Sequence, residues 1–397
     1  MPHRIVVLGA GYAGAFSAGY LARQLHPDDF EITVVDVEPD FVERLRLHQL
    51  AAGQDLRHRP LAELFAHTGI RLRVARVTKV DGEHRTVTVA DGEGNVDRLA
   101  YDTLLYTLGS TAADHGVPGV AEYAFNVAAK PAALRLRARL DELGGDGKVL
   151  VVGGNLTAIE AVTEIAESRP GLRVGLVTSG ELGGWLGPKA HRHLLRAFDR
   201  FDITVHEHTT IEHVGQAAVV AADGTAFASD ATVWAAGFAV HPIAADSGLE
   251  VVADGRIAVD RQMRSVSHPD VYVAGDSAFV IGENGRPLPM SCASAGVTSM
   301  QATAAIIGDR TGREISRTAL SYVGNHISLG RKDAIFQFVD GAARSRSWAL
   351  CGRTAARAKS AILDTAAWSL THPTFGRPGH RYRLSTTRQH SPAVVVA

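Results

Sequence analysis

Two glycine-rich turns carry the residues best suited to holding a phosphate. The first reads Gly9-Ala10-Gly11-Tyr12-Ala13-Gly14 and follows a short β-rich apolar run. Gly9 permits a tight turn, Gly11 lets the backbone approach a pyrophosphate at a helix N-terminus, and Gly14 lets helix and strand pack closely. A second apolar run ends in Asp36, which is placed to accept hydrogen bonds from an adenosine ribose. Strand, turn, helix, strand and acid together predict a dinucleotide site.

The second turn, Gly153-Gly154-Asn155-Leu156-Thr157-Ala158, lies deep inside the chain. It again stands between a predicted strand, Lys148–Val152, and a predicted helix. Asn155 replaces the glycine that lets the backbone come close to a pyrophosphate, and its side chain occupies that approach. Ala158 adds only a methyl group at the point where helix and strand pack, which nucleotide folds accept.

The strand after the second turn, Arg173–Thr178, ends in Thr178-Ser179. An acid at its end would favour NADH, and an arginine just beyond would favour NADPH. Neither is present, and Glu181 lies slightly further on. A weakened nicotinamide site is expected, with NADH and NADPH both open, and a vestigial scaffold lobe remains the alternative.

The composition of the chain argues against several classes of protein. The chain has 397 residues and a formal net charge of -1, so no global field directs it to nucleic acid or to an anionic membrane. Its two cysteines, Cys292 and Cys351, are far apart in sequence, which argues against a redox dithiol and against a disulfide-stapled secreted protein. The first 22 residues fit a strand, turn and helix better than a signal peptide, and no apolar run reaches 18 residues. A cytoplasmic protein is expected.

Two later segments indicate which dinucleotide the first turn binds. One segment runs from Tyr101 to Ser110 and contains Thr107-Leu108-Gly109. The other is a short apolar strand that ends in Gly275-Asp276. The pair resembles the "ATG" and "GD" segments of flavoproteins with two dinucleotide domains, in which the strand-end acid, here Asp276, binds the FAD ribityl chain. That resemblance implies an FAD site split by an inserted second nucleotide domain.

The sequence resembles most the type II NADH dehydrogenase-like branch of the pyridine nucleotide-disulfide oxidoreductases, over nearly the whole chain to about residue 370. The matching segments are GAGYAG with Asp36, TLGS, VVGGNLTAIE, Trp234-Ala235-Ala236-Gly237, VAGD and the stretch from Tyr322 to Gly330. Inside that branch, RLRLHQ followed by Ala51-Ala52-Gly53 is similar to an actinobacterial-type subgroup of FAD-dependent oxidoreductases.

The resemblance implies FAD as a cofactor and NADH or NADPH as the hydride source. It also implies that Glu160 lies beside nicotinamide and flavin and that Cys292 lies near the isoalloxazine ring. Both are candidate catalytic residues, although a small buried apolar residue is the simpler interpretation of Cys292. The candidate cofactor-binding residues are Gly9, Gly11, Tyr12, Ala13, Gly14, Asp36, Arg44, Val77, Thr107, Gly109, Gly153, Asn155, Thr157, Gly237, Gly275, Asp276 and Ala293.

The acceptor site departs from the family pattern. Quinone-reducing members carry an Ala-Gln pair and a second glutamine beside the flavin, but the aligned stretch here, Pro289–Val297, contains no glutamine. A quinone would have no glutamine amide to hydrogen-bond its carbonyl oxygens, so respiratory quinone reduction is not favoured. Because no cysteine pair could relay electrons, a quinone-like or other small organic acceptor is expected to meet the flavin directly.

Histidines and basic residues raise two further hypotheses. Arg44, Arg46 and His48 alternate, which would place them on one side of an extended segment. The family resemblance implies that this region approaches the pyrophosphate and the flavin, so these residues would neutralise phosphate or stabilise reduced flavin; a solvated stretch packed on Glu43 is the alternative. The histidines of the inserted region suggest a metal site only superficially, and a surface-strand interpretation is preferred. They are His191, His193, His206, His208 and His213.

The C-terminal region predicts a helix over residues 354–371. One face carries Ile362, Leu363, Ala366, Ala367 and Leu370, with Arg357, Ser360 and Asp364 opposite. This alanine-rich face favours ordinary packing or a homodimer contact. The tail beyond Pro373 contains basic residues and no acids, so a flexible end is expected and weak attraction to a membrane surface stays open. These residues are Arg377, His380, Arg381, Arg383 and Arg388.

The predicted fold is α/β, with two Rossmann-like domains and a C-terminal α/β region. Residues 1–115 and 255–312 would form the FAD domain, 116–254 the NAD(P)-type domain, 313–372 the C-terminal region and 373–397 a basic tail. The predicted function is that of an FAD-dependent oxidoreductase that takes hydride from NAD(P)H. The alternatives are an oxidase or dehydrogenase of a specialised metabolite with a degenerate nicotinamide site, and a flavin-binding redox partner without turnover.

Overall fold

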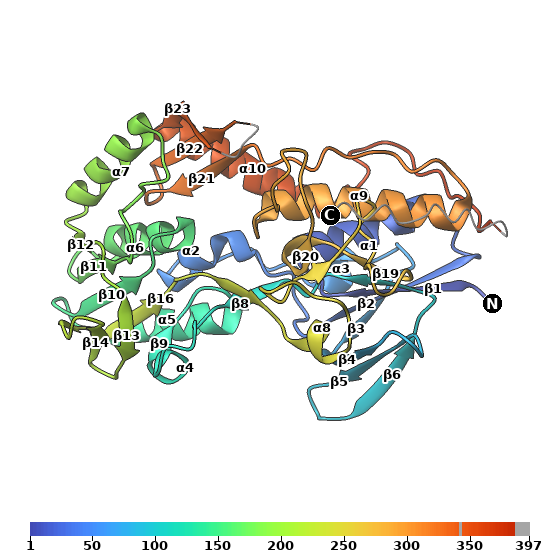
Figure 1. Cartoon of the computed structure of the whole chain (residues 1–397), viewed down its shortest axis with the longest axis horizontal. Helices are drawn as coiled ribbons and strands as arrows, with labels where there is room; N and C mark the ends of the chain where they lie inside the picture. Colours follow the sequence, from blue (N-terminus) through green and yellow to red (C-terminus); the bar gives the residue numbers. More distant parts are fainter. Residues whose placement is uncertain (341–343, 386–397) are drawn as a thin grey trace.

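Two five-stranded parallel sheets frame the molecule, as seen at opposite ends of Figure 1. The computed structural model describes residues 1–340 and 344–385. The first sheet has the order β19-β7-β1-β2-β3. Its strands are β1 (His3–Leu8), β2 (Phe30–Asp36), β3 (Arg71–Val74), β7 (Thr103–Tyr106) and β19 (Val271–Val273). Strands β7 and β19 are parallel neighbours although the second sheet lies between them in the sequence.

The second sheet has the order β12-β11-β10-β16-β9, and all its pairings are parallel. Its strands are β9 (Ala124–Phe125), β10 (Lys148–Val152), β11 (Arg173–Val177), β12 (Thr204–His206) and β16 (Ala231–Trp234). Strands β10, β11 and β16 are almost continuously apolar, as expected of parallel strands covered on both faces. The α/β class with two nucleotide-type sheets, predicted from the sequence, is confirmed.

Smaller antiparallel sheets complete the two lobes. Three have three strands each, β4-β5-β6, β13-β14-β15 and β21-β22-β23, and β8 pairs with β17 between the lobes. Strands β18 and β20 form a separate short parallel pair. The bounds are β4 (Arg76–Asp81), β5 (Thr86–Ala90), β6 (Val96–Ala100), β8 (Ser110–Ala112), β13 (Ile211–Val214), β14 (Ala218–Ala221), β15 (Ala226–Ala228), β17 (Phe238–Val240), β18 (Ile257–Ala258), β20 (Ala278–Phe279), β21 (Gly324–Ser328), β22 (Ala334–Val339) and β23 (Ser345–Cys351).

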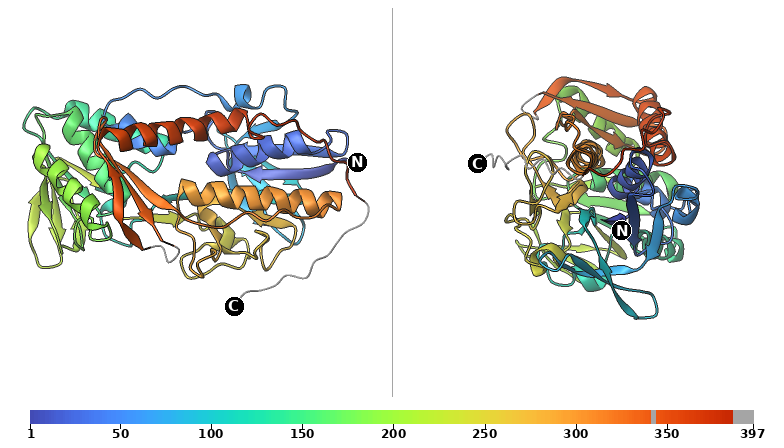
Figure 2. Two further views of the ribbon diagram at one scale, coloured as in Figure 1. Left: turned by 90° about the horizontal axis from the view of Figure 1, so that it is seen from above. Right: turned by 90° about the vertical axis from the view of Figure 1, so that its right-hand side faces the viewer.

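Three long helices lie side by side against the first lobe, where Figure 2 shows α1, α9 and α10 running together. The helices are α1 (Tyr12–Gln24), α2 (Leu47–Ala51), α3 (Leu61–Leu64), α4 (Val120–Tyr123), α5 (Lys130–Glu142), α6 (Leu156–Ser168), α7 (Pro188–Arg200), α8 (Ile243–Asp246), α9 (Cys292–Thr311) and α10 (Arg353–Thr371). Among the described residues, no helix is both long and apolar enough to cross a bilayer.

Two expectations about local structure are wrong. Arg44, Arg46 and His48 do not share one side of an extended segment, because Arg44–Arg46 form a 3₁₀ turn that continues into α2. Helix α10 is present, but Ile362 is exposed and Lys359 lies on the buried face with Leu363. The buried residues of α10 recur about every four positions, and Lys359 is one of them. Its ammonium has an ionic partner inside the protein.

The start of the predicted flexible tail is docked on α1. Tyr382 accepts a hydrogen bond from His26 N–H at 2.9 Å, and Arg383 forms an ion pair with Asp29 at 3.1 Å. These contacts differ from the expected free end, because backbone pairing and an ion pair hold residues 373–385 against the first lobe. Arg388 lies outside the described residues.

Candidate active site

The first glycine turn leaves no room for a side chain at two of its three glycines. A Cβ on Gly9, whose φ is +91°, would stand 2.6 Å from the carbonyl oxygen of Thr107. A Cβ on Gly14 would stand 1.8 Å from the carbonyl oxygen of Gly9. A Cβ on Gly11 would meet nothing within 4 Å, because this position faces a cavity of about 250 Å³. The turn is therefore packed tightly by its own strand and helix and open toward a ligand.

Asp36 joins that cavity to a neighbouring one of about 200 Å³. Its carboxylate accepts hydrogen bonds from the N–H groups of Ala10, at 2.5 Å, and Glu38, at 2.8 Å. Burial raises the pKa of Asp36 in spite of these bonds. Val77 lines the second cavity, as does His241. An adenosine fits this arrangement, with its ribose at Asp36.

Asp276 reaches the same region from the end of β19. Its carboxylate accepts a hydrogen bond from Ser110 Oγ at 2.7 Å, and Ser110 Oγ in turn accepts one from Arg44 at 3.0 Å. Gly275 N–H donates to Thr298 Oγ1 at 3.0 Å, which fixes the turn against α9. Free N–H groups at the start of α1 and acids at two strand ends fit FAD in the first lobe.

In the second glycine turn, the side chain of Asn155 fills the space at the start of α6. Asn155 is the N-cap of α6, and its Oδ1 accepts a hydrogen bond from Ala158 N–H at 3.1 Å. Its Nδ2 donates to the carbonyl oxygen of Ala235 at 2.9 Å. The side chain therefore occupies one of the helix N-terminal amides that a phosphate would use. Thr178 lies over Gly154, where a Cβ would be 2.3 Å from its Oγ1.

The two lobes share one cavity of about 350 Å³. Asn155, Thr157 and Glu160 line it from α6, while Asp276 and Cys292 line it from the first lobe. Further lining comes from Arg44, Leu45, His48, Val127, Leu156, Phe238, Pro289, Met290, Ser291, Ala293, Tyr322, Asn325, His326 and Lys359. Residues distant in sequence thus converge where flavin and nicotinamide are expected to meet.

Glu160 is the centre of a buried charged cluster in this cavity. Its carboxylate pairs with the ammonium of Lys359 from α10 and accepts the N–H of Ser328, from β21, at 2.9 Å. His48 Nδ1 lies 3.9 Å from the other carboxylate oxygen. Burial, the largest single effect, would raise the pKa of Glu160, but the Lys359 ammonium, His48 and the Ser328 N–H together outweigh it. The net effect lowers the pKa, so Glu160 stays ionised at neutral pH.

Neutral groups surround this ion pair. Burial lowers the pKa of His48 to about 4, helped by the nearby Lys359 and Arg46 charges, and burial likewise lowers the pKa of His326. Burial raises the pKa of the Cys292 thiol to about 12, and the nearby Asp276 charge acts in the same direction. A neutral thiol is a poor nucleophile, so this environment gives Cys292 no thiolate chemistry.

Most predicted site residues line these three cavities, but Gly14, Gly153, Gly237 and Arg46 do not. Gly153 is a structural turn residue, since a Cβ would stand 2.4 Å from Ala235 O. Gly237 has a φ of +150° and lies near His115. Arg46 pairs with Glu43 at 3.2 Å and with Asp364 at 2.7 Å, which matches the packed alternative of the sequence analysis.

Sequence reasoning missed the residues contributed by the C-terminal region. Lys359, Ser328 and His326 all approach Glu160, and Tyr322 lines the same cavity. One signal was available for Lys359, because it is spaced four residues from both Ala355 and Leu363 on the apolar stripe of α10. A lysine on such a stripe needs a buried partner. No sequence feature identifies Glu160 as that partner.

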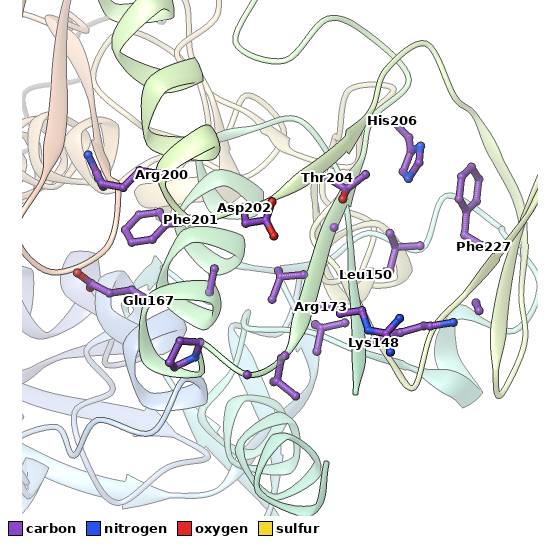
Figure 3. A pocket seen from close by; sticks show the side chains of 18 of the residues that line it. Lys148, Leu150, Glu167, Arg173, Arg200, Phe201, Asp202, Thr204, His206 and Phe227 are labelled. Carbon is purple, nitrogen blue, oxygen red and sulfur yellow. The ribbon is translucent and has the colours of Figure 1, made fainter. Parts of the chain in front are cut away.

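The largest cavity described, about 980 Å³, is not part of this site. It is lined by Lys148 and Arg173, the first residues of β10 and β11, and extends to His206 and Phe227. Figure 3 shows Lys148 and Arg173 close together in this pocket. Nucleotide folds bind their ligands at the carboxyl ends of the strands, so this cavity does not serve the cofactors.

The strand position expected for the second-lobe histidines is wrong for His191 and His193, which lie on α7. His193 bonds Asp333 at 2.7 Å, His191 bonds the carbonyl oxygen of Leu182 at 2.9 Å, and His206 packs on Phe227 with ring centroids 4.6 Å apart. Within residues 1–340 and 344–385, no group of three His, Cys, Asp or Glu side chains could hold a metal ion.

Comparisons with known proteins agree with this geometry. The chain is 26% identical over 369 residues to a type II NADH:quinone oxidoreductase of Staphylococcus haemolyticus, covering 84% of this chain and 89% of the relative. It is 25% identical over 360 residues to an NADH dehydrogenase-like protein of Mycobacterium tuberculosis, covering 84% and 87%.

Solved structures share the fold at lower identity. NDH2 of Plasmodium falciparum in complex with NADH superposes with a TM-score of 0.77 at 14% identity, over 94% of this chain and 97% of that one. The sulfide:quinone oxidoreductase of Aquifex aeolicus gives a TM-score of 0.77 at 20% identity, over 98% and 99%. Residues 3–306 match the pyridine nucleotide-disulphide oxidoreductase family. The chain belongs to this family and is an FAD-dependent oxidoreductase.

Proposed function

We propose that the protein oxidises NAD(P)H and reduces a quinone-like small organic molecule. The observation that carries this proposal is the shared cavity, in which Thr157 and Glu160 of the second lobe face Asp276 and Cys292 of the first. Bound FAD supplies the redox chemistry, by accepting hydride and returning two electrons. The protein's contribution is to bind, orient and exclude water.

The first lobe is proposed to hold FAD along α1. The N–H groups following Gly11 would bind the pyrophosphate, Asp36 the adenosine ribose and Asp276 the ribityl chain. Arg44 supports the flavin region, because its guanidinium bonds Ser110 and lies 5.0 Å from the centre of the Phe238 ring. This guanidinium is thereby held beside the cavity that Asp276 lines.

The second lobe is proposed to bind the nicotinamide dinucleotide weakly. Asn155 occupies the amide of Ala158, and Thr178 offers a hydroxyl where an acid would grip a ribose. Thr157 and Glu160 remain in the cavity to position the nicotinamide. A dinucleotide would lose part of the helix N-terminal attraction but retain the contacts at its reactive ring.

The acceptor is proposed to enter beside Lys359. The cavity wall is apolar at Pro289 and Met290, while Tyr322 and His326 add polar groups, a mixture that suits a flat carbonyl compound. Lys359 carries protons that could bond a developing anionic oxygen, since Glu160 holds its ammonium at the cavity. These groups would replace the glutamine amides missing from Pro289–Val297. The quinone reductase named among the relatives supports the same acceptor class.

A second function is favoured by the closed turn at Asn155. A side chain that caps α6 and bonds Ala235 suits a lobe that covers the organic substrate of an oxidase or dehydrogenase. Such an enzyme would reduce its flavin with that substrate. NADH and NADPH would then bleach the flavin no faster than buffer.

Anaerobic mixing distinguishes these functions. Purified yellow protein is mixed with NADH or NADPH while the flavin absorbance is followed, and menadione is then added. Rapid bleaching followed by reoxidation supports the proposed reaction. Intact bound flavin that neither nucleotide bleaches would reject it in favour of the second function.

A further inference from the structure

The cavity of about 980 Å³ at the amino end of the second sheet has no part in the proposed reaction. Figure 3 shows Glu167, Arg200 and Phe201 at one end of this cavity and His206 and Phe227 at the other. The second end lies on one face of the parallel sheet, and we call it the amino-end pocket. Its residues are Lys148, Leu150, Arg173, Gly175, Thr204, His206 and Phe227.

Strand register fixes the floor of the amino-end pocket. Lys148 pairs with Arg173 on the neighbouring strand, and two positions further on Leu150 pairs with Gly175. Gly175 pairs in turn with Thr204 of β12. Side chains at every second position of a strand share a face, so these residues line one side of the sheet. Because Gly175 has no side chain, the floor is low between Leu150 and Thr204.

An aromatic pair forms a second wall. Phe227 belongs to β15, in the antiparallel sheet β13-β14-β15. Its ring centre lies 4.6 Å from that of His206, and the two ring planes are tilted by 50°. Both rings are partly exposed, whereas Leu150 on the floor is buried. The pocket therefore offers aromatic and aliphatic surface to a flat ring.

Two cations lie side by side at the edge of the pocket. Lys148 and Arg173 are both exposed, and like charges at paired positions of neighbouring strands repel each other. Figure 3 shows their side chains next to each other. Arg173 lies 3.5 Å from Asp146, but both of these side chains are largely exposed, so the pair contributes little. An anionic group placed between the two cations would relieve their repulsion.

No acid within residues 1–340 and 344–385 pairs with the ammonium of Lys148. Glu167 lies at the other end of the cavity, where its carboxylate accepts a backbone N–H at 2.6 Å. Asp202 precedes β12 and lies between the two ends in Figure 3. Asp230 accepts the backbone N–H of Lys148 at 2.8 Å. The Lys148 ammonium is therefore available to an anion in the pocket.

We propose that the amino-end pocket binds a small aromatic carboxylate. The carboxylate would bond Lys148 and Arg173, since charge-assisted bonds to both cations offset their mutual repulsion. The ring would lie on Leu150 and against Phe227. His206 has no hydrogen bond in the described part of the chain and would accept one from a ring N–H or O–H.

This ligand would bind in addition to the cofactors. Strand β10 begins at Lys148 in the pocket and ends at Val152, directly before the second glycine turn. A strand of this length spans about 15 Å, so a ligand at its start leaves the turn free. Binding here requires no flavin reduction, and the proposal therefore stands or falls independently of the proposed function.

Binding is measured by titrating the FAD-loaded full chain calorimetrically with indole-3-acetate, up to about 5 mM. We expect saturable binding without a change in flavin absorbance, because the pocket and the shared cavity are lined by different residues. Indole-3-acetamide keeps the ring without the charge, and acetate keeps the charge without the ring. Each should bind at least about tenfold more weakly, since each loses one of the two kinds of contact.

Two variants locate the site. Gly175→Leu should raise the Kd of indole-3-acetate at least about tenfold, because its side chain fills the space above the floor. Gly175 has no positive φ, so the substitution causes no backbone strain. Lys148→Met with Arg173→Met changes two exposed side chains and should also raise the Kd at least about tenfold. The matched control, Lys79→Met with Arg98→Met, removes the same charges from β4 and β6 and should bind normally.

Three results would overturn the proposal. They are the absence of saturable binding, acetate or indole-3-acetamide binding as tightly as indole-3-acetate, and equal affinity of the double variant and its control. Thermal unfolding confirms that each variant is folded. Binding that perturbs flavin absorbance and survives Gly175→Leu would place the ligand in the shared cavity instead.

Discussion

The two glycine turns differ in what occupies the start of the helix that follows. Helix α1 begins after Gly11, with no side-chain cap, and its first N–H groups face a cavity. Helix α6 begins after Asn155, whose side chain bonds Ala158 N–H and Ala235 O. Both helices follow a parallel strand and a tight glycine. The same fold can therefore present an anion site or fill it with its own side chain.

The packing beneath the turns differs too. Gly14 has no room for a methyl group, whereas Ala158, at the matching place, carries one and is fully buried. The first helix must approach its strand more closely than the second. Close approach and free amides together suit a tightly held cofactor, and a capped helix suits a ligand that leaves after each turnover.

The largest effect is expected from substitutions in the first turn. Gly14→Ala puts a methyl group 1.8 Å from Gly9 O, so the turn cannot close, and both folding and FAD binding should be lost. Gly11→Val should fold with a Tm near that of the apo protein yet lose FAD, because its side chain enters the open cavity. Flavin-to-protein ratio and thermal unfolding measure both. A yellow Gly14→Ala protein with normal stability would disprove the packing difference.

A smaller effect concerns the buried ion pair of the shared cavity. Lys359→Met leaves the Glu160 carboxylate buried without its cation, so unfolding free energy should fall by about 3 to 5 kcal/mol. The double variant Lys359→Met with Glu160→Gln should recover most of this loss. Denaturant unfolding of all four proteins in the cycle gives the coupling. Additive losses would show that the two side chains do not depend on each other.

The lowered pKa of His48 should make the free energy of unfolding depend on pH. Its pKa in the folded protein is about 4, against about 6.5 when unfolded, so the unfolded chain binds the extra proton as pH falls. Stability should drop by roughly 1.5 kcal/mol between pH 6.5 and 5 on this account. Glu160 acts only at lower pH, because its lowered pKa keeps it ionised in this window.

The His48 contribution is isolated by comparison with His48→Gln. His326 also has a lowered pKa, so the difference between the two proteins is the quantity to measure. The variant should lose less stability between pH 6.5 and 5 than the parent. Identical slopes in thermal unfolding over that range would place the proton elsewhere.

The smallest effect is expected at Asn155. Asn155→Gly frees Ala158 N–H, and the lost cap should cost only a few tenths of a kcal/mol. NADH or NADPH should then bind several-fold more tightly, as measured by flavin bleaching at varied nucleotide concentration. Asn155→Ser keeps a cap and serves as the control. Unchanged affinity in Asn155→Gly would mean that the asparagine does not limit nucleotide binding.

Local sequence patterns were sufficient to predict the strand, glycine turn and helix that begin each nucleotide-type lobe. β10 has the predicted bounds, Lys148–Val152, and the first turn lies between β1 and α1 as expected. The conformation of Arg44–His48 was predicted incorrectly, because alternating basic residues do not distinguish an extended strand from a short helical turn. The side chains of this stretch contact Ser110 and Asp364, which belong to other segments.

The sequence by itself determined the two nucleotide turns, their strands and the family, because glycine geometry and apolar periodicity act over a few neighbouring residues. Only the tertiary structure decided that Glu160 meets Lys359, Ser328 and His48, and that Asn155 bonds Ala235. Those partners lie up to 199 positions apart in the chain. Such contacts form when the lobes and the C-terminal region pack together, and pairing over that distance leaves no local pattern to find.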